Sequence, residues 1–161
     1  MSEATQKVIG VKELPIPDLG TPFDFILAYS VFTHTTIENM RDLVGQLRGR
    51  LRPGGVLAFT FEEPEANLPG RLEGIRARNP ALDVERLLRQ SRDSAWCVLV
   101  HDERHAPSLF VEADGMWSNE AEHCVNYDVY HTPAFMSGEF PDAEIRPRVN
   151  GESMHCCIVR G

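Results

Sequence analysis

The sequence predicts an α/β domain with a mostly parallel sheet, organised around a strand–helix–strand unit in residues 23–61. Two runs, 25–32 and 56–61, are almost continuously apolar, which is typical of strands covered on both faces in a parallel sheet. A helix that connects two such strands brings them side by side in the same direction. Between the runs, apolar residues recur at spacings of three and four and form one stripe on a helix: Ile37, Met40, Leu43, Val44, Leu47 and Leu51.

The chain before this unit is an entry segment. Val8, Ile9 and Val11 favour a short strand, and the proline-containing stretch 14–18 favours an extended connector. After the helix, Pro53-Gly54-Gly55 is a turn sequence, which we expect to end the helix and lead the chain into the second strand.

Prolines divide the chain beyond the unit into short elements. Pro64 and Pro69-Gly70 interrupt a stretch that we expect to begin as a loop and continue as helices. Asn79-Pro80 combines a cap residue with a first-turn proline, and it predicts a helix over residues 81–91.

The remaining chain predicts two antiparallel hairpins and one short helix. Each hairpin is indicated by two β-rich runs, and the helix by a threonine cap followed by proline. In chain order, these are a hairpin of 96–100 with 109–111, a helix from Thr132-Pro133 to Glu139, and a closing hairpin of 144–149 with 154–160 around Asn150-Gly151.

Composition indicates one globular domain over residues 1–161 and argues against a nucleic-acid surface. The 24 acidic and 16 basic residues give a net charge of -8, whereas phosphate binding requires clustered cations. No apolar run approaches the roughly 20 residues of a spanning helix, and the N-terminus lacks the apolar segment of a signal peptide. We therefore expect a cytoplasmic protein with neither nucleic-acid nor membrane partners.

The cysteines predict no metal site. Cys97, Cys124, Cys156 and Cys157 show no Cys-x-x-Cys spacing, and free cysteine is often a small buried apolar residue. Cys156 and Cys157 are neighbours in a predicted strand, where successive side chains point to opposite faces.

Three sequence features together resemble a known family. An aspartate opens the first strand in Phe23-Asp24-Phe25-Ile26, and the stretch Ser30-Val31-Phe32-Thr33-His34 follows that strand. After one helix comes Leu51-Arg52-Pro53-Gly54-Gly55. This order resembles the fourth-strand and fifth-strand region of class I S-adenosylmethionine-dependent methyltransferases. The closing helix and hairpin also resemble the end of that family's fold.

The resemblance implies a Rossmann-like fold, here a partial doubly wound sheet with an antiparallel C-terminal hairpin. It implies S-adenosylmethionine as cofactor, contacted by Ala28, Tyr29 and Ser30, and a small-molecule or sugar-like methyl acceptor. The family's Gly-x-Gly-x-Gly loop would lie upstream, where this sequence has only the isolated Gly10 and Gly20. We therefore expect an N-terminally truncated domain whose cofactor half lies outside this chain.

Histidine and tyrosine side chains supply the other candidate site residues. His34 follows the first strand at the edge where ligands of open α/β sheets bind, so it is either a general base or a polar residue before a threonine-capped helix. Tyr127 and His131 are candidates for substrate binding or for a wet domain edge. His101 and His105 are predicted to be exposed.

Without upstream strands, the run 25–32 would form an open, apolar edge. Such an edge favours pairing with a second copy or another chain, unless the N-terminal segment covers it. We expect residues 94–131 to form an insertion that lies over the carboxyl edge of the sheet. In relatives, insertions at this place cap the substrate. Three hypotheses follow: a methyltransferase that requires its upstream half, a non-catalytic remnant that acts as an interaction or dimerisation module, and a Rossmann-like enzyme with a nicotinamide cofactor.

Overall fold

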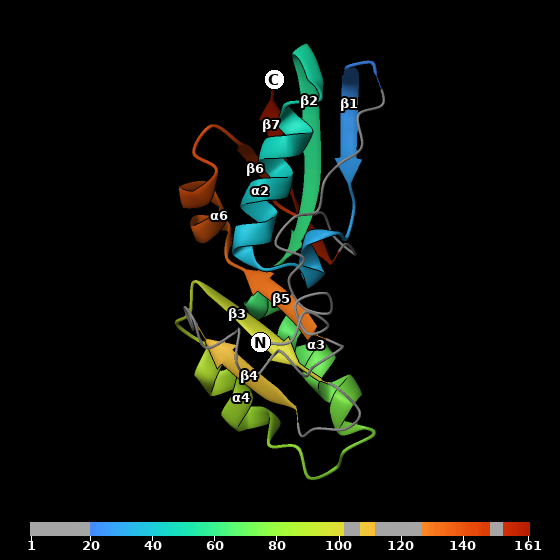
Figure 1. Cartoon of the computed structure of the whole chain (residues 1–161). Coiled ribbons are helices and arrows are strands. Elements are labelled where there is room, and N and C mark those ends of the chain that lie inside the picture. The colour runs from blue at the N-terminus through green and yellow to red at the C-terminus, as the bar shows by residue number, and fades with distance from the viewer. Residues whose placement is uncertain (1–19, 102–106, 112–126, 149–152) are drawn as a thin grey trace.

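The computed structural model describes residues 20–101, 107–111, 127–148 and 153–161, and it shows a mixed α/β fold (Figure 1). Its helices pack against one mixed sheet of seven strands. The helices are α2 (Ile37–Arg48), α3 (Pro64–Arg76), α4 (Val84–Ser91) and α6 (Pro133–Glu139). The strands are β1 (Phe23–Ala28), β2 (Leu51–Glu62), β3 (Trp96–Val100), β4 (Ser108–Val111), β5 (Tyr127–His131), β6 (Glu144–Arg146) and β7 (Met154–Arg160).

The predicted strand–helix–strand unit is present. β1 and β2 pair in parallel, with Phe25 opposite Val56 and Ala28 opposite Phe59, and α2 connects them. The hydroxyl of Thr36 accepts a hydrogen bond from the backbone N–H of Asn39, so a threonine caps α2 as expected.

The second half of this unit differs from the prediction at its start. α2 ends at Arg48, and Leu51 opens β2 instead of closing the helix. The Pro53-Gly54-Gly55 turn lies inside β2, where the register with β1 shifts between Phe23 and Phe25. A Cβ on Gly55 would lie 2.9 Å from two carbonyl oxygens, those of Arg52 and Phe23, so this irregularity requires glycine.

The expectation of a mostly parallel sheet is not confirmed. In the described residues, β2 pairs in parallel with β1 and, through one bridge between Glu62 and Tyr130, with β5. The β2–β7, β6–β7, β3–β4 and β3–β5 pairs are antiparallel. The closing hairpin was expected in this sheet, whereas the hairpin of β3 and β4, expected in a cap over the sheet edge, joins the sheet through β5.

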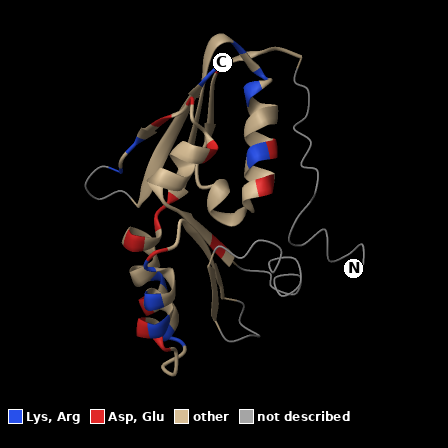
Figure 2. Cartoon of the chain, turned by 90° about the vertical axis from the view of Figure 1, so that its left-hand side faces the viewer, with Lys and Arg blue, Asp and Glu red and all other residues tan. Residues whose placement is uncertain are grey.

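Two helical layers enclose the core at opposite ends of the sheet (Figure 1). Near α2 and α6, the core contains Phe32, Phe59, Phe61 and Phe140, and edge-to-face ring contacts join Phe59 to Phe32 and Phe140. At the other end, α3 and α4 bury leucines against β3, β4 and β5. Acidic and basic residues are mixed along α3 and α4, as expected for a solvated helical face (Figure 2).

The helices after β2 begin and end at other residues than predicted. α3 starts at Pro64 and continues through Pro69, although this region was expected to begin as a loop. Proline at the first helical position is favourable, whereas Pro69 removes an internal hydrogen bond. α4 starts at Val84, later than predicted, because Asp83 caps it by accepting a hydrogen bond from the N–H of Arg86.

One face of β1 is uncovered in the described part of the chain, contrary to the prediction of a strand buried on both faces. The exposed fractions are 57% for both Phe25 and Leu27, and those of Tyr29 and Val31, which follow the strand, are 65% and 45%. Within the same described residues, β1 pairs with β2 alone. No described helix is long and apolar enough to cross a membrane.

Candidate functional site

A polar cavity of about 440 Å³ lies where β1 and β2 end and β5 begins. Its size is within the ordinary range for small-molecule sites. Polar side chains from the turn after β1 and from β2, α3 and β5 line it: Ser30, Thr33, His34, Glu62, Asn67, Arg71, Asp128 and Tyr130. The cavity therefore occupies the carboxyl edge of the parallel β1–β2 pair, where the sequence placed a site.

A tight turn after β1 fixes the first wall of the cavity. Ser30 has a φ of 56°, which is unusual for a residue other than glycine, and its backbone N–H donates to Thr60 Oγ1 at 2.8 Å. The Thr33 hydroxyl donates back to the Ser30 carbonyl at 3.1 Å. A 3₁₀ turn, Phe32–His34, follows, and its buried Phe32 anchors the exposed His34 beside the cavity.

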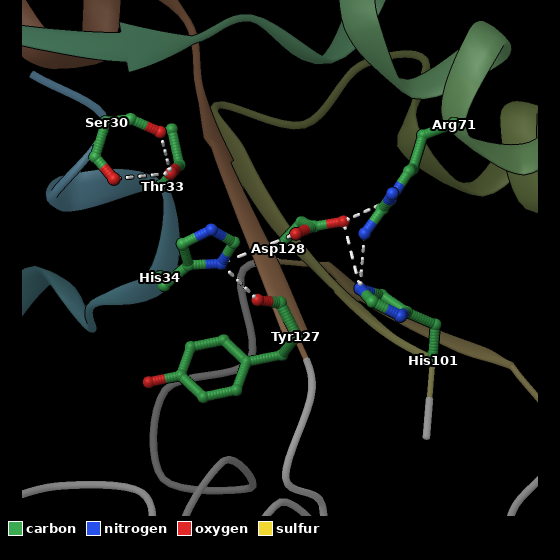
Figure 3. Close-up of polar contacts among 7 residues, drawn as sticks. All are labelled: Ser30, Thr33, His34, Arg71, His101, Tyr127 and Asp128. Carbon is green, nitrogen blue, oxygen red and sulfur yellow. Dashed lines mark hydrogen bonds and ion pairs between the residues drawn. The ribbon is translucent and has the colours of Figure 1, made fainter. Parts of the chain in front are cut away.

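The ring of His34 is held in one tautomer. Its Nδ1 lies 2.8 Å from the Tyr127 carbonyl oxygen and 3.4 Å from Asp128 Oδ1 (Figure 3). Because a carbonyl oxygen can only accept, Nδ1 carries the proton and donates it. The neutral ring then presents the lone pair of Nε2, for which the described residues provide no partner. His34 is thus positioned as a proton acceptor.

Asp128 is the centre of the polar cluster. Its carboxylate lies between His34 on one side and Arg71 and His101 on the other (Figure 3), with Oδ2 2.6 Å from Arg71 Nε and 3.0 Å from His101 Nε2. The Asp128 side chain is only 8% exposed. Burial by itself would raise its pKa, but the hydrogen bond from His101 and the charges of His101 and Arg71 hold that pKa below its ordinary value.

His101 Nε2 has two neighbours that require opposite roles. It lies 3.0 Å from Asp128 Oδ2 and 3.0 Å from Arg71 Nη2. One ring nitrogen cannot donate to the carboxylate and accept from the guanidinium at the same time. We assign the proton to Nε2, because a hydrogen bond to a buried carboxylate is the stronger of the two.

Glu62 ends β2 and turns a second carboxylate toward the cavity. Burial raises the pKa of Glu62, and repulsion from Asp128 adds to the increase, while His34 and Arg71 partly offset it. Within the described part of the chain, no group donates a hydrogen bond to this carboxylate. Glu62 is therefore a half-buried acceptor that faces the cavity.

The structure brings some predicted site residues together and separates others. Ser30 and His34 line the cavity, and Tyr127 contributes its carbonyl oxygen to His34. Ala28 is buried in the core, and the Tyr29 side chain is exposed outside the cavity. Another predicted site residue, His131, is fully buried, stacks on Phe135 and does not line the cavity, while His105 lies outside the described residues.

Glu62, Arg71 and Asp128 were not predicted from the sequence, and His101, predicted to be exposed, has a side chain only 12% exposed that contacts Asp128. Asp128 carried a signal, because it interrupts the apolar run Tyr127–His131, and a carboxylate inside a buried strand requires a partner. No signal in the sequence pointed to Arg71, since it is one of several arginines on the mixed-charge surface of α3 and α4.

The side chains of the neighbouring residues Cys156 and Cys157 differ in burial, as predicted for successive positions of a strand. Cys157 is fully buried while its neighbour Cys156 is half-exposed, as alternation along a strand requires. Burial raises the pKa of both Cys97 and Cys157 to about 12, so neither is a thiolate at neutral pH. The described residues contain no group of three or more potential metal ligands.

No protein-family model matches this chain, and a search of curated proteins finds no similar sequence.

Proposed function

We propose that this chain is a methyltransferase-like protein that acts on a small molecule, with the cavity beside His34 as its acceptor site. The observation that carries the proposal is the parallel β1–α2–β2 unit with an open polar cavity at its carboxyl edge. The same unit and the antiparallel β6–β7 pair support a finer fold assignment, a partial Rossmann-like sheet.

The residues around the cavity suit the acceptor side of such a reaction. His34 Nε2 can take a proton from a hydroxyl or amine, because Tyr127 and Asp128 orient the ring through Nδ1. Ser30 and Thr33, on the same turn as His34, offer hydroxyl groups that can position the acceptor.

The described residues fit the cofactor less well than the acceptor. They contain no glycine-rich turn between a strand and a helix that could hold a nucleotide, and Ser30 is the one predicted cofactor residue that lines the cavity. S-adenosylmethionine would supply an electrophilic methyl group. The proposal therefore includes a nucleotide-binding half from outside the described part of the chain.

Titration calorimetry with S-adenosylmethionine tests the proposal. Catalysis by this chain alone predicts a saturable heat in the millimolar range or below, followed by transfer of an isotopically labelled methyl group to a small-molecule acceptor. His34→Gln should leave the titration unchanged and lower the transfer rate by about 10²-fold or more, because it removes the proton acceptor. A well-folded protein that gives no heat would exclude unaided catalysis.

A second candidate function is that of a non-catalytic interaction module. The exposed apolar face of β1 and its open edge favour pairing with a second copy or with a complete methyltransferase. Light scattering after size exclusion separates these cases. A monomer at every concentration would exclude self-pairing.

A further inference from the structure

We infer that the cavity binds a small organic amine in its protonated form, with the ammonium group against Glu62 and near His34 Nε2. The inference rests on the proposed function in one respect, that this cavity is the acceptor site. It adds the substrate class, and amine binding itself requires no methyl donor.

Two groups that face the cavity without a partner in the described residues, the Glu62 carboxylate and His34 Nε2, are hydrogen-bond acceptors, while the Tyr130 hydroxyl can donate or accept. No described residue donates to the half-buried Glu62 carboxylate, so its oxygens are open to a ligand in the cavity. The lone pair of His34 Nε2 is also available, because Nδ1 donates to the Tyr127 carbonyl. A ligand that satisfies both groups must bring hydrogen-bond donors.

The guanidinium of Arg71, which lines the cavity, is already paired with Asp128. Arg71 donates through Nε to Asp128 at 2.6 Å, and its Nη2 lies beside His101. A carboxylate or phosphate ligand would have to compete with Asp128 for this guanidinium. It would also lie close to two negative charges, those of Glu62 and Asp128, which is unfavourable in a partly buried site.

The charge balance favours a cation. Arg71 and His101 both lie against Asp128, so Glu62 is the carboxylate of the cavity lining that has no ion pair with a described residue. The pKa of Glu62 is raised by burial and by Asp128, and a bound ammonium group would offset both effects. One ammonium group therefore neutralises the charge of Glu62.

The wall formed by α3 leaves room for the rest of the molecule. Ala66 and Gly70 line the cavity on this helix, and a Cβ on Gly70 would meet nothing within 4 Å. The body of the ligand can lie along this small-residue surface while its amino group reaches Glu62.

The test compares three probes of equal size that differ in charge: 2-phenylethylamine, 2-phenylethanol and phenylacetate. Each is titrated into the full chain, without a methyl donor, in mildly alkaline buffer, and backbone amide shifts are followed by NMR. We expect the amine to bind about tenfold or more tightly than the alcohol, since a hydrogen bond to a charged group contributes about 1.5–3 kcal/mol. Phenylacetate should bind most weakly.

Substitutions in and beside the cavity test whether the amine binds at Glu62. Glu62→Gln should weaken amine binding about tenfold and leave alcohol binding unchanged, because it removes the charge and keeps the shape. Glu65→Gln is the matched control, since this exposed residue of α3 does not line the cavity and should leave amine binding unaltered. Gly70→Leu should abolish binding of the amine and the alcohol by filling the open space without changing charge.

Two results would overturn the inference: phenylacetate binding more tightly than the amine, or Glu62→Gln binding the amine as well as the wild type does. The outcome is separable from that of the proposed function. Amine binding that depends on Glu62, together with no heat from S-adenosylmethionine, would support the amine site and exclude methyl transfer by this chain alone.

Discussion

At the scale of single residues, Asp128 joins the two sides of the cavity. Its buried carboxylate accepts from Arg71 and His101 and lies next to His34. We predict that Asp128→Asn lowers the free energy of unfolding by about 2 kcal/mol, because it removes charge-assisted hydrogen bonds and leaves Arg71 without its counter-ion. Urea denaturation measures the change.

The matched control is Asp142→Asn, which breaks the exposed ion pair with Arg48. Surface pairs contribute little, so we expect a change below about 1 kcal/mol. Equal losses for the two variants would contradict the view that Asp128 is a structural centre of the site.

His131 predicts how stability depends on pH. The ring is fully buried, and the described residues offer neither nitrogen a hydrogen bond. Burial lowers its pKa to about 4 from 6.5, so the unfolded chain binds a proton more readily than the folded chain between these values. Stability should therefore fall as pH decreases from about 6.5 towards 4, by roughly 3 kcal/mol for this residue.

The variant His131→Phe keeps a ring that can stack on Phe135 and removes the titrating group. Its stability should change less than that of the wild type over the same pH range. Unfolding curves measured across that range test this, and parallel pH profiles for the two proteins would show that His131 is not the source of the dependence.

Sequence reasoning found site residues that lie close together along the chain. Ser30 and His34 follow a recognisable strand, and the sheet edge defines where they lie. Asp128, Glu62 and Arg71 meet only through the pairing of β2 with β5 and the packing of α3 beside that junction. Apolar periodicity carries no information on such distant contacts, and it also gave no reason to expect His131 in the core.

At the scale of secondary-structure elements, the glycines of the β1–α2–β2 unit have opposite roles. Gly55→Ala should destabilise the protein by about 1–3 kcal/mol, because the new Cβ would lie 2.9 Å from two backbone oxygens. Gly45→Ala, in the interior of α2 with no atom within 4 Å, should stabilise it by about 0.5–1 kcal/mol. Thermal unfolding compares them, and equal shifts would be the contrary result.

α3 contains an internal proline, Pro69, which lowers the stability of the helix. Pro69→Ala should raise the free energy of unfolding by about 2 kcal/mol, since alanine restores a helical hydrogen bond. Pro64→Ala is the control, because the first helical position needs no N–H partner and the substitution should bring no gain. A loss of stability in Pro69→Ala would mean that packing of the proline ring outweighs the missing hydrogen bond.

The elements with strong local signals were predicted well. Thr132 caps α6 by accepting from the N–H of Phe135, and both hairpins form antiparallel pairs. Pro69 misled the prediction, because helix packing against the sheet overrides a single unfavourable residue.

At the scale of the whole molecule, the uncovered face of β1 predicts association. Phe25, Leu27 and Tyr29 are each more than half exposed beside an edge that is open in the described residues. We expect the apparent mass to increase with concentration in light scattering, and Leu27→Lys to reduce this increase, because a charge disfavours burial of the face. An identical concentration dependence for the variant would place the contact elsewhere.

The direction of strands across the sheet could be predicted only in part. The connection through α2 implied that β1 and β2 are parallel. No local pattern indicated that β5 would continue the sheet from the end of β2 and bring β3 and β4 with it.

The position of β2 also has a consequence for synthesis on the ribosome. One flank of β2 pairs with β1, which is synthesised before it, whereas the other pairs with β7, about a hundred residues later, with Val56 opposite Arg160. The nascent protein must therefore carry a long, apolar strand with one unpaired flank until β7 has been synthesised. Such an intermediate is a natural client for chaperones.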